Sequence, residues 1–153
     1  MVIFVCPAAI SVSAGIGFSS VKQRDFFFAP TVISGRNTSV FALKDRSSAR
    51  PLPLVLVNTR LCDFNDNLGL HFSTGVGVDL KTGQTGTEID YVVGLSLLVR
   101  NQFFVTLGGN ITRVPELIGG FQIGQEVPAG ISEPPLQKNL RGGVAFTFTY
   151  RIK

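Results

Sequence analysis

The sequence has no tryptophan, a single methionine, a single histidine and two cysteines in 153 residues, and only 16% of its residues are charged. Ala, Glu, Lys and Gln, which favour helices, are few, whereas Gly (17 residues), Phe (13 residues), Val, Thr and Ser dominate. Because β-branched and aromatic residues fit a pleated sheet, this composition indicates strands and turns. With 44% hydrophobic residues, the chain is also too apolar to be disordered.

No apolar run is long enough for a membrane-spanning helix. The longest, residues 1–10, is interrupted by Cys6 and Pro7 and lacks the basic segment that begins a signal peptide. Either an export signal lies upstream, so that the chain is the C-terminal part of a longer protein, or its start is misassigned.

The motifs that carry enzymatic chemistry are missing as well. There is no Gly-x-Ser-x-Gly, Cys-x-x-Cys or phosphate-binding loop, and His71 has no second histidine with which to bind a metal. Asp79, Glu88 and Asp90 flank one loop, where we expect solvated acids rather than a catalytic pair. We therefore expect no enzyme activity, no catalytic residue, no metal and no cofactor.

The formal net charge of +4 comes from scattered residues and not from a basic stripe. We therefore expect no nucleic-acid partner. Lys and Arg at the rim of a membrane protein meet anionic lipid headgroups, which explains this charge at least as well.

The strongest signal is a hydrophobic period of two. From Ile89 to Val99 every second residue is apolar, and the residues between them include Asp90, Gly94 and Ser96. The same alternation predicts strands over residues 9–22, 52–62, 68–80, 88–100, 102–112 and 142–152. Two further apolar runs, Phe26–Val32 and Ser39–Leu43, flank a Gly-Arg-Asn turn and predict an additional hairpin.

The connections between these strands alternate in length. Residues 63–67 and 100–102 form short turns, whereas 29–51, 81–87 and 113–141 are longer. Asp63, Asn65 and Asn67 are spaced like the start of a calcium loop, but the glycine falls one position late, so we expect an Asx-rich turn. The long loop 113–141 contains several apolar residues and is expected to fold back over the barrel or to pack against other residues.

Strands of about ten residues with one apolar face and one face of Gly, Ser and Thr suit a transmembrane barrel. Lipid requires an apolar exterior and a fully paired backbone. The predicted fold is all-β, an antiparallel up-and-down meander that forms a transmembrane β-barrel of six to eight strands, with residues 1–153 as one domain. Such barrels usually start at about eight strands. We expect the additional hairpin to supply two further barrel strands; otherwise upstream strands are missing or several copies share one barrel.

In the C-terminal segment, Arg141, Gly143, Phe146 and Phe148 follow the pattern polar, any, Gly, any, any, aromatic, any, aromatic, and Tyr150 continues the aromatic series. This segment resembles the β-signal of bacterial outer-membrane β-barrel proteins. The resemblance implies that the last strand is recognised by the barrel-assembly machinery, and that the protein lies in the bacterial outer membrane with membrane lipid as a partner.

Two local features are left open. Cys6 and Cys62 fall at the same end of adjacent predicted strands, so they could form a disulfide or remain two buried thiols. The run Phe26–Phe28 could belong to an aromatic girdle at the membrane interface or pack in a core.

The sequence therefore favours an outer-membrane β-barrel with a structural, adhesive or small-pore role and no catalysis. Two alternatives stand beside it: a soluble ligand-binding β-barrel, and a β-sandwich subunit of a filament or shell assembly. A soluble barrel would need a more charged exterior than this composition supplies. Behaviour in buffer without detergent separates the first reading from the other two.

Overall fold

The structure is a computed structural model that describes residues 9–45, 50–79 and 88–152. It contains eight strands. They are β1 (Ile10–Ser19), β2 (Arg24–Ile33), β3 (Arg36–Asp45), β4 (Arg50–Asn65), β5 (Leu68–Asp79), β6 (Glu88–Val99), β7 (Phe103–Leu117) and β8 (Leu136–Ile152). The described residues form no helix, so the all-β prediction is confirmed.

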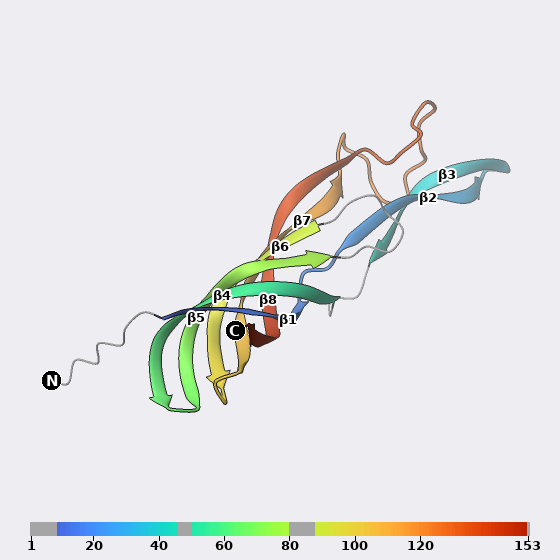
Figure 1. Ribbon diagram of the computed structural model, residues 1–153. Coiled ribbons are helices and arrows are strands. Elements are labelled where there is room, and N and C mark those ends of the chain that lie inside the picture. Colours follow the sequence, from blue (N-terminus) through green and yellow to red (C-terminus); the bar gives the residue numbers. More distant parts are fainter. Residues whose placement is uncertain (1–8, 46–49, 80–87, 153) are drawn as a thin grey trace. The chain divides into compact units, whose positions relative to one another are not determined.

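Six of the strands form a closed antiparallel ring in the order β1-β4-β5-β6-β7-β8 (Figure 1). β1 pairs with β4 from Ile10↔Thr59 to Ser19↔Arg50, and on its other side it pairs with β8. All six strands of the ring were predicted from the alternation. Two of these strands are longer than predicted. β7 extends to Leu117 and β8 begins at Leu136, both inside the segment predicted as a loop.

The predicted hairpin also forms, but it does not enlarge the ring. β2 and β3 pair with each other from Arg24↔Asp45 to Ile33↔Arg36 and make a separate two-stranded sheet. The expectation that this hairpin supplies two further barrel strands is wrong, because β1 pairs directly with β4. At its tip Ser34 and Gly35 have φ angles of 52° and 76°, as a tight two-residue hairpin turn requires.

The chain divides into two compact units. The barrel unit consists of Met1–Val21, Ala49–Thr112 and Arg141–Lys153, and the hairpin unit of Lys22–Ser48 and Arg113–Leu140. β7 and β8 each continue from one unit into the other. That residues 1–153 form one domain stays a prediction.

Within the hairpin unit, part of the long loop runs beside β3. The amide of Phe41 donates to the carbonyl oxygen of Gln125 over 3.0 Å, and the amide of Val127 donates to that of Ser39 over 2.8 Å. Phe41 is fully buried, and its ring contacts those of Phe28 and Phe121 at centroid distances of 5.5 and 5.0 Å. The expectation that this loop packs against other residues is confirmed. In the run Phe26–Phe28, Phe28 is half-buried against Phe41 and Phe27 is exposed.

The two short turns of the barrel unit match their predictions. The amide of Asn67 donates to Asn65 Oδ1 over 2.9 Å, which closes the expected Asx turn between β4 and β5. Arg100 and Asn101, between β6 and β7, have φ angles of 52° and 55°. These turns lie at the same end of the barrel, which we call the turn end (Figure 1).

Candidate functional site

Each strand of the ring contributes one buried polar side chain to a single layer inside the barrel. We call this layer the polar belt. It consists of Ser13, Asn58, Ser73, Ser96, Thr106 and Thr149.

Asn58 is the centre of the polar belt. Its Nδ2 donates to Ser13 Oγ over 2.9 Å, and its Oδ1 accepts from Ser73 Oγ over 2.5 Å. On the far side of β1, Thr149 Oγ1 donates to Ser13 Oγ over 2.8 Å. A single amide thus joins three neighbouring strands, and a hydroxyl extends the connection to the closing strand β8.

The polar belt continues from β5 to β7 through hydroxyl groups. Ser73 and Ser96 share a hydrogen bond, and Ser96 Oγ lies 2.7 Å from Thr106 Oγ1. Because the residues of the belt are buried and hydrogen-bonded, they fill the barrel instead of lining a water-filled channel. An apolar cluster of Leu54, Leu56, Val92 and Ala145 fills the interior beside them.

Glycines on the inner face allow the strands of this narrow barrel to approach closely. A Cβ on Gly75 would collide with the carbonyl oxygen of Val55, and one on Gly108 would collide with that of Val93. Gly77, on the same face of β5, has room, since its nearest atoms would lie 3.5 Å from an added Cβ. Gly75 therefore relieves crowding between β4 and β5.

The outer face of the barrel is apolar. On β6 the burial pattern alternates strictly, with Ser96 and Asp90 inside and Tyr91 and Leu95 outside. Large apolar side chains stay exposed on every strand of the ring. They include Ile10, Ile16, Val55, Leu61, Phe72, Val76, Ile89, Tyr91, Val93, Leu95, Leu97, Phe103, Leu107, Ile111, Val144, Phe148, Tyr150 and Ile152.

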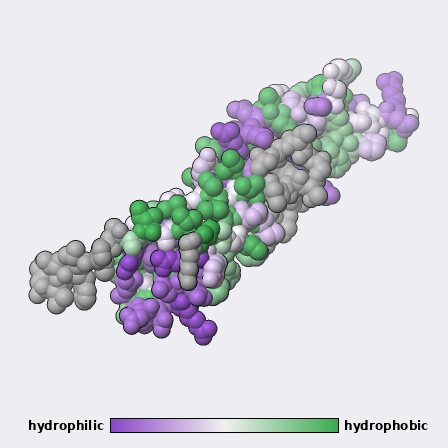
Figure 2. Space-filling view, viewed as in Figure 1, coloured by the Kyte–Doolittle hydropathy of each residue, from purple (hydrophilic) through white to green (hydrophobic). Residues whose placement is uncertain are grey.

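The space-filling view shows the same division over the surface. Hydrophobic residues gather over the strands of the barrel, and hydrophilic residues gather at the turn end (Figure 2). This differs from a soluble barrel, because the interior holds a polar belt beside its apolar cluster while the exterior is apolar.

The predicted β-signal residues lie on the strand that closes the ring. β8 pairs with β1 from Val12↔Ile152 to Ser19↔Ala145, and this stretch includes Phe146, Phe148 and Tyr150. Their rings face outward, and those of Phe146 and Phe148 contact each other edge to face at 4.7 Å. Arg141 and Gly143 precede the paired stretch on the same strand.

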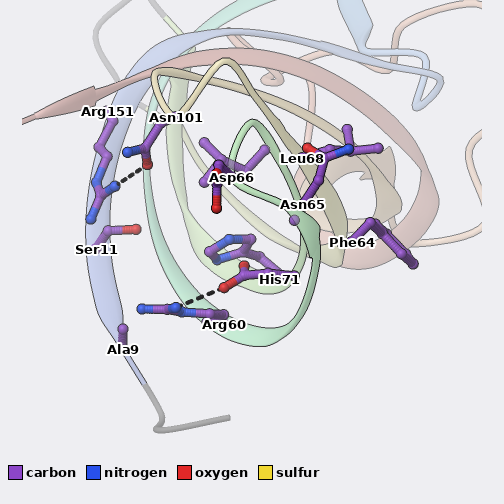
Figure 3. A pocket seen from close by; sticks show the side chains of 13 residues that line it. Ala9, Ser11, Arg60, Phe64, Asn65, Asp66, Leu68, His71, Asn101 and Arg151 are labelled. Carbon is purple, nitrogen blue, oxygen red and sulfur yellow. Dashed lines mark hydrogen bonds and ion pairs between the residues drawn. The ribbon is translucent and has the colours of Figure 1, made fainter. Parts of the chain in front are cut away.

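A cavity of about 510 Å³ opens at the turn end of the barrel. Figure 3 shows His71 at its centre, with Arg60 on one side and Asp66 on another, and Asp63 also lines the cavity. The imidazole of His71 is buried and meets the ring of Phe104 edge to face at a centroid distance of 5.1 Å. One side of His71 therefore packs in the barrel, and the cavity adds a polar space beside it.

Two polar pairs border this cavity. Arg60 Nη1 lies 2.7 Å from Asp63 Oδ2 in an ion pair, and Arg151 Nη1 donates to Asn101 Oδ1 over 2.7 Å. The residues come from β4, from the closing strand β8 and from the β6–β7 turn. Sequence reasoning did not bring them together, because strands far apart in the chain meet at this end only when the ring closes.

Two of the three acids expected to be solvated are buried instead. Glu88 and Asp90 are buried, because the inward positions of β6 fall on these residues. The side chain of Asp79 lies outside the described residues, as does Cys6. Cys62 is partly buried on β4. Because Cys6 is not described, the disulfide between Cys6 and Cys62 stays a prediction.

In the described part of the chain, no group of three or more His, Cys, Asp or Glu side chains is placed to hold a metal ion. Residues 9–45, 50–79 and 88–152 also include no helix that is long and apolar enough to cross a membrane. Compared with protein-family models, curated proteins and solved structures, the chain has no match.

The sequence analysis missed the polar belt as a connected unit. Its signal is present, since Ser13, Ser73, Ser96 and Thr106 all occupy the small polar face of their predicted strands. The hydrogen bonds between them depend on strand register, which alternation alone does not supply.

Proposed function

We propose that this chain is a non-enzymatic β-barrel embedded in a bilayer, with a structural or adhesive role. The observation that supports this most strongly is the distribution of side chains in the barrel, with a hydrogen-bonded polar belt inside and apolar side chains outside. Bilayer hydrocarbon suits this outer face, because it offers no partner for polar groups and accepts apolar ones.

The length of the apolar face fits a bilayer. On β6, outward apolar residues recur from Ile89 to Val99. At roughly 3.3 Å per residue, ten residues extend about 33 Å, and a strand tilted by about 40° then rises about 25 Å. This equals the height of the apolar band of outer-membrane barrels, about 25 Å.

The filled interior favours a structural or adhesive role over a pore. The polar belt joins all six strands of the ring, and Leu54, Leu56 and Val92 fill the space next to it. Passage of a solute would require these buried hydrogen bonds to break. We therefore place the structural or adhesive role ahead of the small-pore role.

Location in the bacterial outer membrane is part of this proposal. It rests on the likeness of Arg141, Gly143, Phe146, Phe148 and Tyr150 to a β-signal and on the position of β8 as the closing strand. The barrel-assembly machinery is then the partner that handles β8, and lipid is the partner of the outer face.

Two alternatives make different use of the same faces. A soluble ligand-binding barrel would place its apolar face inside, whereas here Leu95 and Phe148 are exposed and Ser73 and Ser96 are buried. An assembly subunit, including a homo-oligomer, could cover the outer face with further copies. It would then form large particles without detergent.

The test is to export the chain in a bacterium, fractionate the cells, and run the envelope fraction on a gel with and without boiling. We expect the chain in the outer membrane, with a mobility that changes on heating because the barrel stays folded in detergent. A protein that stays in solution without detergent would contradict the proposal, and discrete large particles would favour the assembly alternative.

A further inference from the structure

We propose that the cavity at the turn end of the barrel binds a small zwitterion, a molecule with one anionic group and one primary ammonium group. The cavity of about 510 Å³ is large enough for such a molecule and is bordered by Arg151, Asp66 and His71 (Figure 3). The inference does not rest on the proposed function, because the cavity lies inside the barrel unit whatever covers the outer face.

The first argument is the balance of charges. Arg60 and Asp63 neutralise each other in their ion pair. Arg151 donates to the neutral amide of Asn101. Within the described ranges, no acid forms an ion pair with Arg151 and no base forms one with Asp66. One half-buried cation and one exposed anion at the same cavity therefore lack an ion-pair partner among the described residues.

The second argument is the buried imidazole of His71, which lines the same cavity. His71 is only 4% exposed, and neither of its ring nitrogens has a hydrogen-bond partner among the described residues. An unsatisfied buried polar atom costs about 1–3 kcal/mol, so a bound polar group that reaches the imidazole would offset that cost. Neutral imidazole can both donate and accept, so it suits either end of a zwitterion.

The third argument is the position of two polar atoms beside Gly69. A Cβ on this residue would lie 2.7 Å from Asp63 Oδ1 and 3.3 Å from His71 Nε2, so both atoms lie close to the backbone at this point of the cavity wall. Because Arg60 and Asp63 are paired, the charges that act on a ligand are those of Asp66 and Arg151. A ligand with a single negative charge would be repelled by Asp66, and one with a single positive charge by Arg151, whereas a zwitterion complements both.

The experiment is calorimetric titration of the full folded chain, in detergent or in buffer as its solubility requires. Two zwitterions serve as probes: glycylglycine, which represents a free short peptide, and O-phosphoethanolamine, which represents a lipid headgroup. N-acetylglycine and ethylamine carry one charge each and serve as controls. We expect both zwitterions to bind at least about tenfold more tightly than either control. The zwitterion that binds more tightly indicates whether the natural ligand is a free short peptide or a lipid headgroup.

Two variants remove the charges of Arg151 and Asp66 separately. Arg151→Gln and Asp66→Asn are each expected to weaken zwitterion binding by roughly tenfold or more, as the loss of one charge-assisted hydrogen bond implies. Arg36→Gln, on the exposed start of β3, is the control and should bind like the unaltered chain. Far-UV circular dichroism checks that each variant is folded, whether the chain is in detergent or in buffer.

The inference is overturned if the folded chain binds neither zwitterion, if a single-charge control binds as tightly as they do, or if both variants retain full affinity. Because the readout is binding in solution, a chain that proves soluble would contradict the membrane proposal and leave this test intact.

Discussion

At the scale of the residue, Asn58 is the one amide of the polar belt. It donates to Ser13 and accepts from Ser73, so it links three strands through one side chain. The serines of the belt do the same through rotatable hydroxyls, whereas a side-chain amide offers a donor and an acceptor at fixed positions. We therefore test the contribution of the polar belt at this amide.

Replacing Asn58 with Leu is expected to lower the free energy of unfolding by about 1–3 kcal/mol, since two buried hydrogen bonds are lost without a change of size. Urea unfolding of the folded chain in detergent measures the change. Thr74→Val, on the exposed face of the neighbouring strand, is the matched control and should stay within about 0.5 kcal/mol. Equal stability of the Asn58 variant would show that the belt does not hold the strands.

At the scale of the element, β5 offers two glycines on one face with opposite surroundings. Gly75 lies against the backbone of β4, where an added Cβ would meet the Val55 carbonyl oxygen, whereas Gly77 has space. Gly75→Ala is expected to cost about 1–3 kcal/mol through overpacking. Gly77→Ala is expected to be neutral or to stabilise the strand by up to about 1 kcal/mol.

Thermal unfolding of the two glycine variants, followed by circular dichroism, makes this comparison. The order of stability matters more than the values, because both substitutions add the same methyl group to the same strand. If Gly75→Ala proved as stable as Gly77→Ala, the close approach of β4 and β5 would not be a requirement of the fold.

The hairpin of β2 and β3 is an element that the ring does not need. β1 pairs directly with β4, and the hairpin forms its own sheet. Replacing Lys22–Ser48 with a short Gly-Ser linker should therefore leave a folded barrel, with the heat-dependent gel mobility retained. Loss of that mobility would mean that the hairpin unit contributes to closure of the ring.

At the scale of the whole molecule, much of the fold follows from the sequence. Alternation located the six strands of the ring, because a period of two is a local property that each strand carries alone. The turn at Asn65 and Asn67 was equally local. Closure of the ring is not a local property, because whether β4 pairs with β1 or with β3 depends on contacts between distant segments.

The candidate site shows the same limit. The sequence predicted a face of small polar residues, yet Ser13 and Thr149, 136 residues apart, meet only when β8 joins β1. The cavity likewise needs Arg60 and Arg151 at one end of a closed ring. Glu88 and Asp90 were misjudged because a loop nearby suggested solvent, whereas strand parity places them inside.

The central claim is that the outer face of the barrel contacts lipid. The chain contains no tryptophan, so a single introduced tryptophan reports on its own position. Leu95→Trp places the probe outward at the middle of β6, and Phe64→Trp places it at the exposed turn end. Both variants would be folded into vesicles whose acyl chains carry bromine, which quenches tryptophan fluorescence on contact. We expect strong quenching and blue-shifted emission for Leu95→Trp and little quenching for Phe64→Trp. A folded Leu95→Trp variant with water-exposed, unquenched emission would contradict the membrane barrel.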